Sequence, residues 1–337
     1  MKHSRITGYS VASGICAMWA ALWASTSAFA APDLFVGNFF GPGNEDVLRY
    51  NGTTGAFGGT FVPTGSGGLS FPLGGSFGPD SNLYVSNSDA DNVLRYNGTT
   101  GAFLNVFASS VGDAAGLAFG PDGNLYVADA SSPGAVTKLN GTTGALINTF
   151  GSGQLLDPEG LGFGPDGNLY VANVDGNDVL RYNPTTGAFI DAFVAAGSGG
   201  LVSPRDVVFG PDNNLFVTSF GTNQVLEYNG TTGAFLDAFV AAASGGLDLP
   251  RDLVFGPDDN LYVGSFGSGD ILRYDGMTGA FISTFVPAGS GGLGGPTFLT
   301  FHDISSATPV PEPGTLTLLG SALAGLVAWR RKAIRAG

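Results

Sequence analysis

The sequence predicts an all-β protein, a six-bladed β-propeller of four-stranded antiparallel blades. Three short signatures recur along the chain in a fixed order, which is typical of an array of equal structural units. The first is Leu-aromatic-Val, which begins at six positions spaced 42 to 49 residues apart: Leu34, Leu83, Leu125, Leu169, Leu215 and Leu261. The second follows each of these starts and is typified by Val-Leu-Arg-Tyr-Asn-Gly-Thr-Thr-Gly-Ala-Phe at 47–57. The third, Phe-Gly-Pro-Asp, precedes five of the six starts, at Phe77, Phe119, Phe163, Phe209 and Phe255.

Each unit contains four short apolar runs, which we expect to be the strands of one blade. In the fifth unit they lie at 205–209, 214–218, 224–228 and 234–240. The turn between the first two contains Pro, Asp and Asn, which favour tight turn geometries. The turn between the last two is Asn-Gly-Thr-Thr-Gly, which predicts a hairpin loop with Gly at a positive φ. Because the middle runs are apolar on both faces, we expect each sheet to be packed between two neighbours.

The two ends of the array predict a closed ring. The first unit begins at its second strand and has no Phe-Gly-Pro-Asp run. The missing piece lies at 296–303, which matches 204–212 in register with one residue fewer in the turn. We therefore expect the C-terminal strand to become the innermost strand of the first blade, which leaves the ring without free edges.

Both termini have the features of targeting segments. Residues 1–30 have a basic start, an apolar run from Val11 to Ala24 and an Ala-x-Ala site, which predict a secretory signal peptide. An N-terminal membrane anchor is the alternative, although the apolar run is short for a span. The only cysteine, Cys16, lies in this segment, so we expect the processed chain to contain no disulfide. The predicted domains are thus 1–30, the propeller at 31–309 and a C-terminal segment at 310–337.

The C-terminal segment carries Pro311, Glu312 and Pro313, then an apolar stretch and a basic tail. This order resembles the PEP-CTERM sorting signal. The resemblance implies an exported protein tethered in the inner membrane through a C-terminal transmembrane helix. An exosortase-type enzyme then processes it to the cell surface or the extracellular space. It also implies a link to the exopolysaccharide matrix or another envelope component. A plain tail anchor is the alternative, and it differs in leaving the body tethered.

The charge distribution excludes nucleic-acid binding. The chain carries a formal charge of −14, and residues 31–309 hold seven Lys+Arg against 26 Asp+Glu, a net −19. Nucleic-acid phosphates require clustered Lys and Arg, which this body lacks.

The candidate site lies at the starts of the innermost strands, where the otherwise uniform units differ most. The residues singled out there are Glu159, Arg205, Asp206, Arg251 and Asp252. Because they fall at equivalent positions of three consecutive blades, we expect them to converge on one side of the channel mouth. The other blades contribute Thr, Leu, Ala, Gly and Phe there, so we expect one charged side and one apolar side. This arrangement favours a small polar ligand such as a sugar, with the arginines gripping a carboxylate or hydroxyls. The alternative is that the Arg–Asp pairs are solvated and only help to seat the blades.

The unit at 116–129 resembles the NHL repeat and its relatives, the gluconolactonase-type propellers and the streptogramin lyases. The former hold a divalent metal with Glu, Asn and Asp, and only Glu159 matches that set. The latter use a His base, and His302 is the only His outside the signal peptide. We therefore expect no catalytic residues, no metal site and no cofactor. The predicted function is a non-catalytic binding or structural module; a hydrolase or lyase acting from the channel mouth is the alternative.

Overall fold

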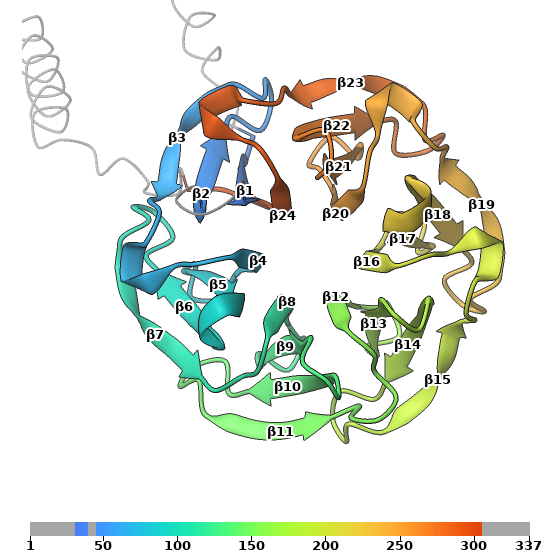
Figure 1. Ribbon diagram of the computed structural model, residues 1–337, viewed down its shortest axis with the longest axis horizontal. Coiled ribbons are helices and arrows are strands. Elements are labelled where there is room, and N and C mark those ends of the chain that lie inside the picture. The colour runs from blue at the N-terminus through green and yellow to red at the C-terminus, as the bar shows by residue number, and fades with distance from the viewer. Residues whose placement is uncertain (1–30, 40–44, 305–337) are drawn as a thin grey trace, which may run out of the picture. The chain divides into compact units, whose positions relative to one another are not determined.

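A computed structural model describes residues 31–39 and 45–304, and these form a six-bladed β-propeller (Figure 1). Each blade is a four-stranded antiparallel sheet, so the predicted fold class is confirmed. The blades are numbered here in chain order, blade 1 being the one that contains β1. The predicted signal peptide and the predicted sorting segment lie outside the described residues.

The strands occupy four concentric positions around the channel. The innermost strands are β4 (Pro72–Phe77), β8 (Ala114–Phe119), β12 (Pro158–Phe163), β16 (Pro204–Phe209), β20 (Pro250–Phe255) and β24 (Pro296–His302). The second strands are β1 (Asp33–Phe39), β5 (Leu83–Asn87), β9 (Leu125–Asp129), β13 (Leu169–Asn173), β17 (Leu215–Ser219) and β21 (Leu261–Ser265). The third strands are β2 (Glu45–Tyr50), β6 (Asn92–Tyr96), β10 (Ala135–Leu139), β14 (Asp178–Tyr182), β18 (Gln224–Tyr228) and β22 (Asp270–Tyr274). The outer strands are β3 (Phe57–Val62), β7 (Phe103–Ser109), β11 (Leu146–Phe150), β15 (Phe189–Val194), β19 (Phe235–Val240) and β23 (Phe281–Val286).

The ring is closed by the last strand, as the split first unit predicts. β24 pairs antiparallel with β1, placing Leu34 opposite Phe301 and Val36 opposite Leu299. β24 therefore supplies the innermost strand of blade 1, in the order β24-β1-β2-β3. The first and last strands of the propeller lie side by side in one sheet (Figure 1).

The core lies between the blades, which explains why the second strands are apolar on both faces. Every residue of β17 is buried, because the strand packs against a neighbouring sheet on each side. The Tyr170 ring shows how the blades are joined. It makes edge-to-face contacts with Phe193 of its own blade and Phe209 of the next, at centroid distances of 4.9 and 4.8 Å. Such contacts add to the free energy gained from burial alone.

The Phe-Gly-Pro-Asp turns are stabilised by their own side chains. In blade 4, Asp166 Oδ1 accepts a hydrogen bond from the backbone N–H of Asn168 at 3.0 Å. Its Oδ2 accepts bonds from the Asn168 amide at 2.7 Å and the Tyr170 hydroxyl at 3.0 Å. The same arrangement recurs in blade 3 around Asp122. These carboxylates cap the turn, as the turn residues in the sequence predict. They also hold a core tyrosine by its hydroxyl.

A second set of contacts joins the third and outer strands of blades 1, 2, 5 and 6 to the preceding blade. Tyr228 of blade 5 donates a hydrogen bond to the carbonyl of Ser198 in blade 4 at 2.8 Å. Phe235 covers the same turn, where Gly199 has a φ of +65° and a Cβ would overlap the Phe235 ring. The equivalent tyrosine bonds occur at Tyr50, Tyr96 and Tyr274. Within the part of the chain that the structure describes, the tyrosine bond is missing between blade 3 and blade 2, and it is also missing between blade 4 and blade 3.

The interruptions at blade 3 have distinct causes. Leu139 stands in blade 3 where the other units carry Tyr, so no hydroxyl is available to reach blade 2. On its other side, the Tyr182 hydroxyl of blade 4 is buried and has no hydrogen-bond partner. The turn that it faces in blade 3 reads Gly-Ser-Gly-Gln at 151–154 and differs from the Gly/Ala-Ser-Gly-Gly turn of blades 1, 4, 5 and 6.

Candidate ligand site at the channel mouth

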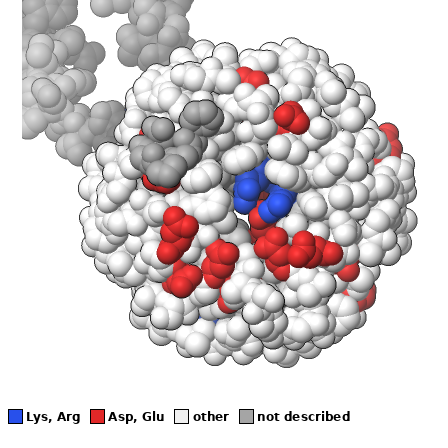
Figure 2. All heavy atoms as spheres, viewed as in Figure 1, with Lys and Arg blue, Asp and Glu red and all other residues white. Residues whose placement is uncertain are grey.

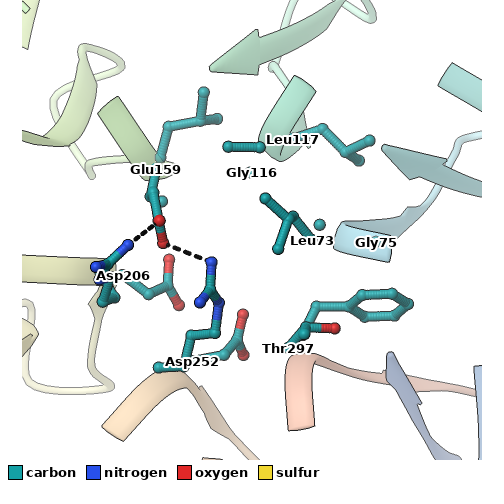
Figure 3. A pocket seen from close by; sticks show the side chains of 15 residues that line it. Leu73, Gly75, Gly116, Leu117, Glu159, Asp206, Asp252 and Thr297 are labelled. Carbon is teal, nitrogen blue, oxygen red and sulfur yellow. Dashed lines mark hydrogen bonds and ion pairs between the residues drawn. The ribbon is translucent and has the colours of Figure 1, made fainter. Parts of the chain in front are cut away.

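The five predicted site residues lie together around one cavity of about 50 Å³ at the start of the innermost strands (Figure 3). Glu159 comes from β12, Arg205 and Asp206 from β16, and Arg251 and Asp252 from β20. The opposite wall is formed by blades 1 to 3 and is mainly apolar: Leu73, Gly74, Gly75, Ala115, Gly116, Leu117 and Phe298, with Thr297 as the one polar side chain among the described residues there. The mouth thus has one charged side and one mainly apolar side, because the repeats carry different side chains at these strand starts.

Glu159 is held between the two arginines (Figure 3). Its Oε1 forms an ion pair with Arg205 Nη1, and its Oε2 accepts a hydrogen bond from Arg251 Nη2 at 3.0 Å. The exposed fractions of the three side chains are 10% for Glu159, 19% for Arg205 and 11% for Arg251. The alternative of solvated Arg–Asp pairs is wrong in exposure and in pairing: the arginines are largely buried, and their ion pairs within the described residues are with Glu159.

Two phenylalanines support the arginines from the loops that follow the second strands. The Arg205 guanidinium lies 4.7 Å from the centroid of Phe220, and that of Arg251 lies 5.6 Å from the centroid of Phe266. Cation–π contacts of this kind fix the guanidinium plane. The sequence reasoning missed these two residues. A Ser-Phe-Gly triplet at 219–221 and 265–267 occurs in the two units whose innermost strand begins with Pro-Arg-Asp, and this joint occurrence was the available signal.

Asp206 and Asp252 lie deeper and join neighbouring blades. Asp206 Oδ2 accepts a hydrogen bond from the backbone N–H of Leu253 at 3.3 Å, and Asp252 Oδ1 accepts one from Leu299 at 3.0 Å. Blades 2 to 4 have Gly at the equivalent position. At Gly116 a Cβ would overlap the carbonyl oxygen of Glu159. In blades 2 to 4, Gly at this position lets the backbones of neighbouring blades lie close together. In blades 5 and 6, Asp at this position accepts a hydrogen bond from the next blade.

Burial changes the protonation of the two deep carboxyls. It raises the pKa of Asp206 to about 7, and the Glu159 charge acts in the same direction, against the backbone N–H groups of Val207 and Leu253. Burial also raises the pKa of Asp252 well above its ordinary value, with the Asp206 charge contributing. Removing a carboxylate from water disfavours its charged form. Asp206 thus gains its negative charge only as the pH rises through neutrality.

The charged side chains around the mouth are mainly acidic. Figure 2 shows basic side chains at the centre of this face and acidic side chains gathered mostly over blades 2 to 4. Asp157 precedes β12, and its pKa is raised mainly by burial and to a smaller extent by the nearby Glu159 charge.

Among the described residues, no group of three or more His, Cys, Asp or Glu side chains is arranged to hold a metal ion. His302 ends β24 and stacks on Phe77 at a centroid distance of 3.7 Å. It is therefore a residue of the closing strand.

Comparison with known protein families identifies the C-terminal segment. Residues 309–332 match the PEP-CTERM protein-sorting motif, which confirms the resemblance seen in the sequence. The motif indicates an exported, envelope-targeted protein and implies exosortase processing in general. No helix within residues 31–39 and 45–304 is long and apolar enough to cross a membrane.

Comparison with solved structures supports the propeller fold alone, and no curated protein matches the chain. A protein of unknown function from Bacteroides caccae aligns with a TM-score of 0.63 and 15% identity over 81% of this chain and 99% of its own. A chain of a nidogen/laminin complex aligns with a TM-score of 0.61 and 16% identity over 80% and 98%. A catalytically inactive variant of virginiamycin B lyase from Staphylococcus aureus, solved with quinupristin, aligns with a TM-score of 0.54 and 12% identity. The alignment covers 84% of this chain and 87% of the lyase chain. At these identities the fold transfers and the function does not.

Proposed function

We propose that this protein is an exported, non-catalytic propeller that binds a small polar ligand at the channel mouth and acts as a binding or structural module in the cell envelope or exopolysaccharide matrix. The observation that carries the proposal is the convergence of Glu159, Arg205 and Arg251 from three consecutive blades onto one cavity opposite an apolar wall. Clefts that combine an apolar wall with a few fixed polar groups are the usual form of small-molecule sites. The sorting motif supports export.

The arginines retain hydrogen-bonding capacity for a ligand. Each contacts Glu159 through one terminal nitrogen, and Arg205 Nε is buried without a hydrogen-bond partner. An unsatisfied buried donor costs free energy, so a ligand or bound water that accepted from it would be stabilised. A cavity of about 50 Å³ has room for a few water molecules or the hydroxyl-bearing edge of a larger molecule.

In this proposal residues 1–30 are removed as a signal peptide and residues 31–309 form the working module. Residues 310–337 tether it in the inner membrane until an exosortase-type enzyme acts near Pro311, Glu312 and Pro313. A polysaccharide or another envelope component is the proposed partner. The acidic body supports the exclusion of nucleic acid.

A glycan-array and metal-content screen with a charge-free variant tests the binding function. Replacing Glu159, Arg205 and Arg251 together with Met removes the charges while keeping hydrophobic volume, and such replacements of buried ion triads are often neutral or stabilising. We expect this variant to fold and to lose the glycans that the wild type binds. Arg273→Met is the matched control, because Arg273 also lies over a ring, that of Phe285, but on a third strand. A triple variant that bound the same glycans as the wild type would refute the site.

A hydrolase or lyase acting from the channel is the second candidate, and one observation favours it. Asp206 lines the cavity with a pKa of about 7, which suits a general acid or base at neutral pH. Incubation with quinupristin, the compound bound by the aligned lyase, tests this candidate. If the protein is such an enzyme, it should turn quinupristin over, and the pH profile of the rate should have an inflection near the Asp206 pKa of about 7. Asp206→Asn should remove that inflection. Absence of turnover would argue against this lyase activity.

A further inference from the structure

The Glu159 carboxylate occupies the position that the carboxylate of a bound anion would take. Its two oxygens each contact a different guanidinium, so the arginine pair already holds an anion (Figure 3). We propose that Glu159 makes the mouth selective for uncharged, hydroxyl-rich ligands and is the residue that excludes anionic ones. This inference rests on the proposed binding function and names the ligand class of that same site.

The charges around the cavity support the exclusion of anions. Arg205 and Arg251 contribute two positive charges, and Glu159 cancels one of them. Asp206 and Asp252 also line the cavity and add negative charge whenever they ionise. At most one net positive charge remains to attract an anion, and a ligand carboxylate would meet the like charge of Glu159 at short range.

Hydroxyl groups fit the same arrangement because they both donate and accept. A hydroxyl can accept from a guanidinium N–H and at the same time donate to a carboxylate oxygen, whereas an ionised carboxylate can only accept. The charged side of the cavity presents both kinds of partner within one cluster, the two arginines with Glu159 between them. A pair of neighbouring hydroxyls on a sugar or another polyol could use both.

The opposite wall and the size of the cavity limit the ligand further. Leu73, Leu117 and Phe298 offer only apolar surface on that side, which suits the C–H face of a polyol ring. The cavity of about 50 Å³ admits one edge of such a ring rather than a whole oligosaccharide. We therefore expect recognition of a terminal, neutral unit.

Pairs of sugars that differ only at C6 test the proposal: glucose with glucuronate, and galactose with galacturonate. Binding to the purified full-length protein is measured by ligand-observed NMR and calorimetry for the wild type, Glu159→Gln and Glu159→Asp. Glu227→Gln is the matched control, since Glu227 also hydrogen-bonds a neighbour, Asn214, but lies on β18 away from the cavity. Acetate is added as a plain anion probe, read as a shift in melting temperature.

We expect the wild type to bind the neutral member of a pair and to bind its charged partner with an affinity that is lower by roughly tenfold or more. Glu159→Gln should gain the charged member and be stabilised by acetate, whereas Glu159→Asp and the control should not. Removing one partner of a buried ion pair can also unfold a protein. Glu159→Gln/Arg251→Gln is therefore the second variant: it keeps the formal charge of the cluster and leaves Arg205 unpaired, so it should also respond to acetate.

The failures are distinguishable. If the wild type binds the charged sugars as well as the neutral ones, the role of Glu159 is refuted while the binding function stands. The same holds if the wild type binds a neutral sugar but neither Gln variant responds to anions. If the wild type and both Gln variants bind no member of either pair and do not respond to acetate, the mouth is structural. Both the inference and the proposed function then fail.

Discussion

Asp252 accepts a hydrogen bond at 3.0 Å from the backbone N–H of Leu299, and this bond joins blade 6 to the strand that closes the ring. Replacing Asp252 with Ala should leave that N–H buried and unsatisfied, at a cost of about 1–3 kcal/mol in the free energy of unfolding. Asp252→Asn keeps an acceptor oxygen and should cost less. Urea denaturation of the two variants measures the difference, and equal stabilities would show that the bond contributes little.

The deep carboxyls predict a particular pH dependence of stability. The folded-state pKa of Asp206, about 7, lies above the unfolded value of about 3.9, and that of Asp252 is raised as well. The folded state thus binds more protons between these values, so their contribution to stability falls as the pH rises from about 4 to about 7. The wild type should lose stability relative to Asp206→Asn/Asp252→Asn across this range. Parallel curves of unfolding free energy against pH would contradict the assignment.

The two buried tyrosines at equivalent positions make a matched pair. Tyr228→Phe removes the hydrogen bond to the Ser198 carbonyl and should cost about 0.5–1.5 kcal/mol of stability. Tyr182→Phe removes a buried hydroxyl without a partner and should be neutral or stabilising. Chemical denaturation of both variants distinguishes the cases, and an equal loss in both would show that Tyr182 makes a bond of the same strength.

Removal of the last strand tests ring closure. A chain ending at Gly295 lacks β24, which exposes the edge of β1 and the inner faces of blades 2 and 6. Unpaired edges of this kind promote aggregation. We expect light scattering to show association and calorimetry a lower melting temperature. A monomer with an unchanged melting temperature would rule out the closing role.

Processing of the C-terminal segment is accessible to mass spectrometry. If the sorting motif at 309–332 directs cleavage near Pro311–Pro313, peptides from 315–337 should be missing from protein recovered outside the cell. Cell-associated precursor should still contain them. Intact tail peptides in the released material would refute processing at that site.

The fold was predictable because the repeat determines both the strand boundaries and their order. Turn chemistry such as Asp166 with Asn168 separates the strands, and the split first unit predicted the pairing of β24 with β1. The members of the site were predictable for the same reason: equivalent positions of equal blades converge. Their partners were not, because pairing depends on how far a side chain reaches across the channel. Glu159 contacts both arginines of other blades, one of them 92 residues away in the chain.

The pairing of the two end strands also bears on the order in which the protein can fold. Asp33 lies opposite His302, so the contact that completes blade 1 joins residues 269 positions apart (302 minus 33). Contacts of such long separation form slowly, because the intervening chain must be ordered first. Blades 2 to 6 contain only local hairpins and can form while the chain is still emerging. Blade 1 must wait until β24 has been made, so a chain interrupted before His302 cannot complete the ring.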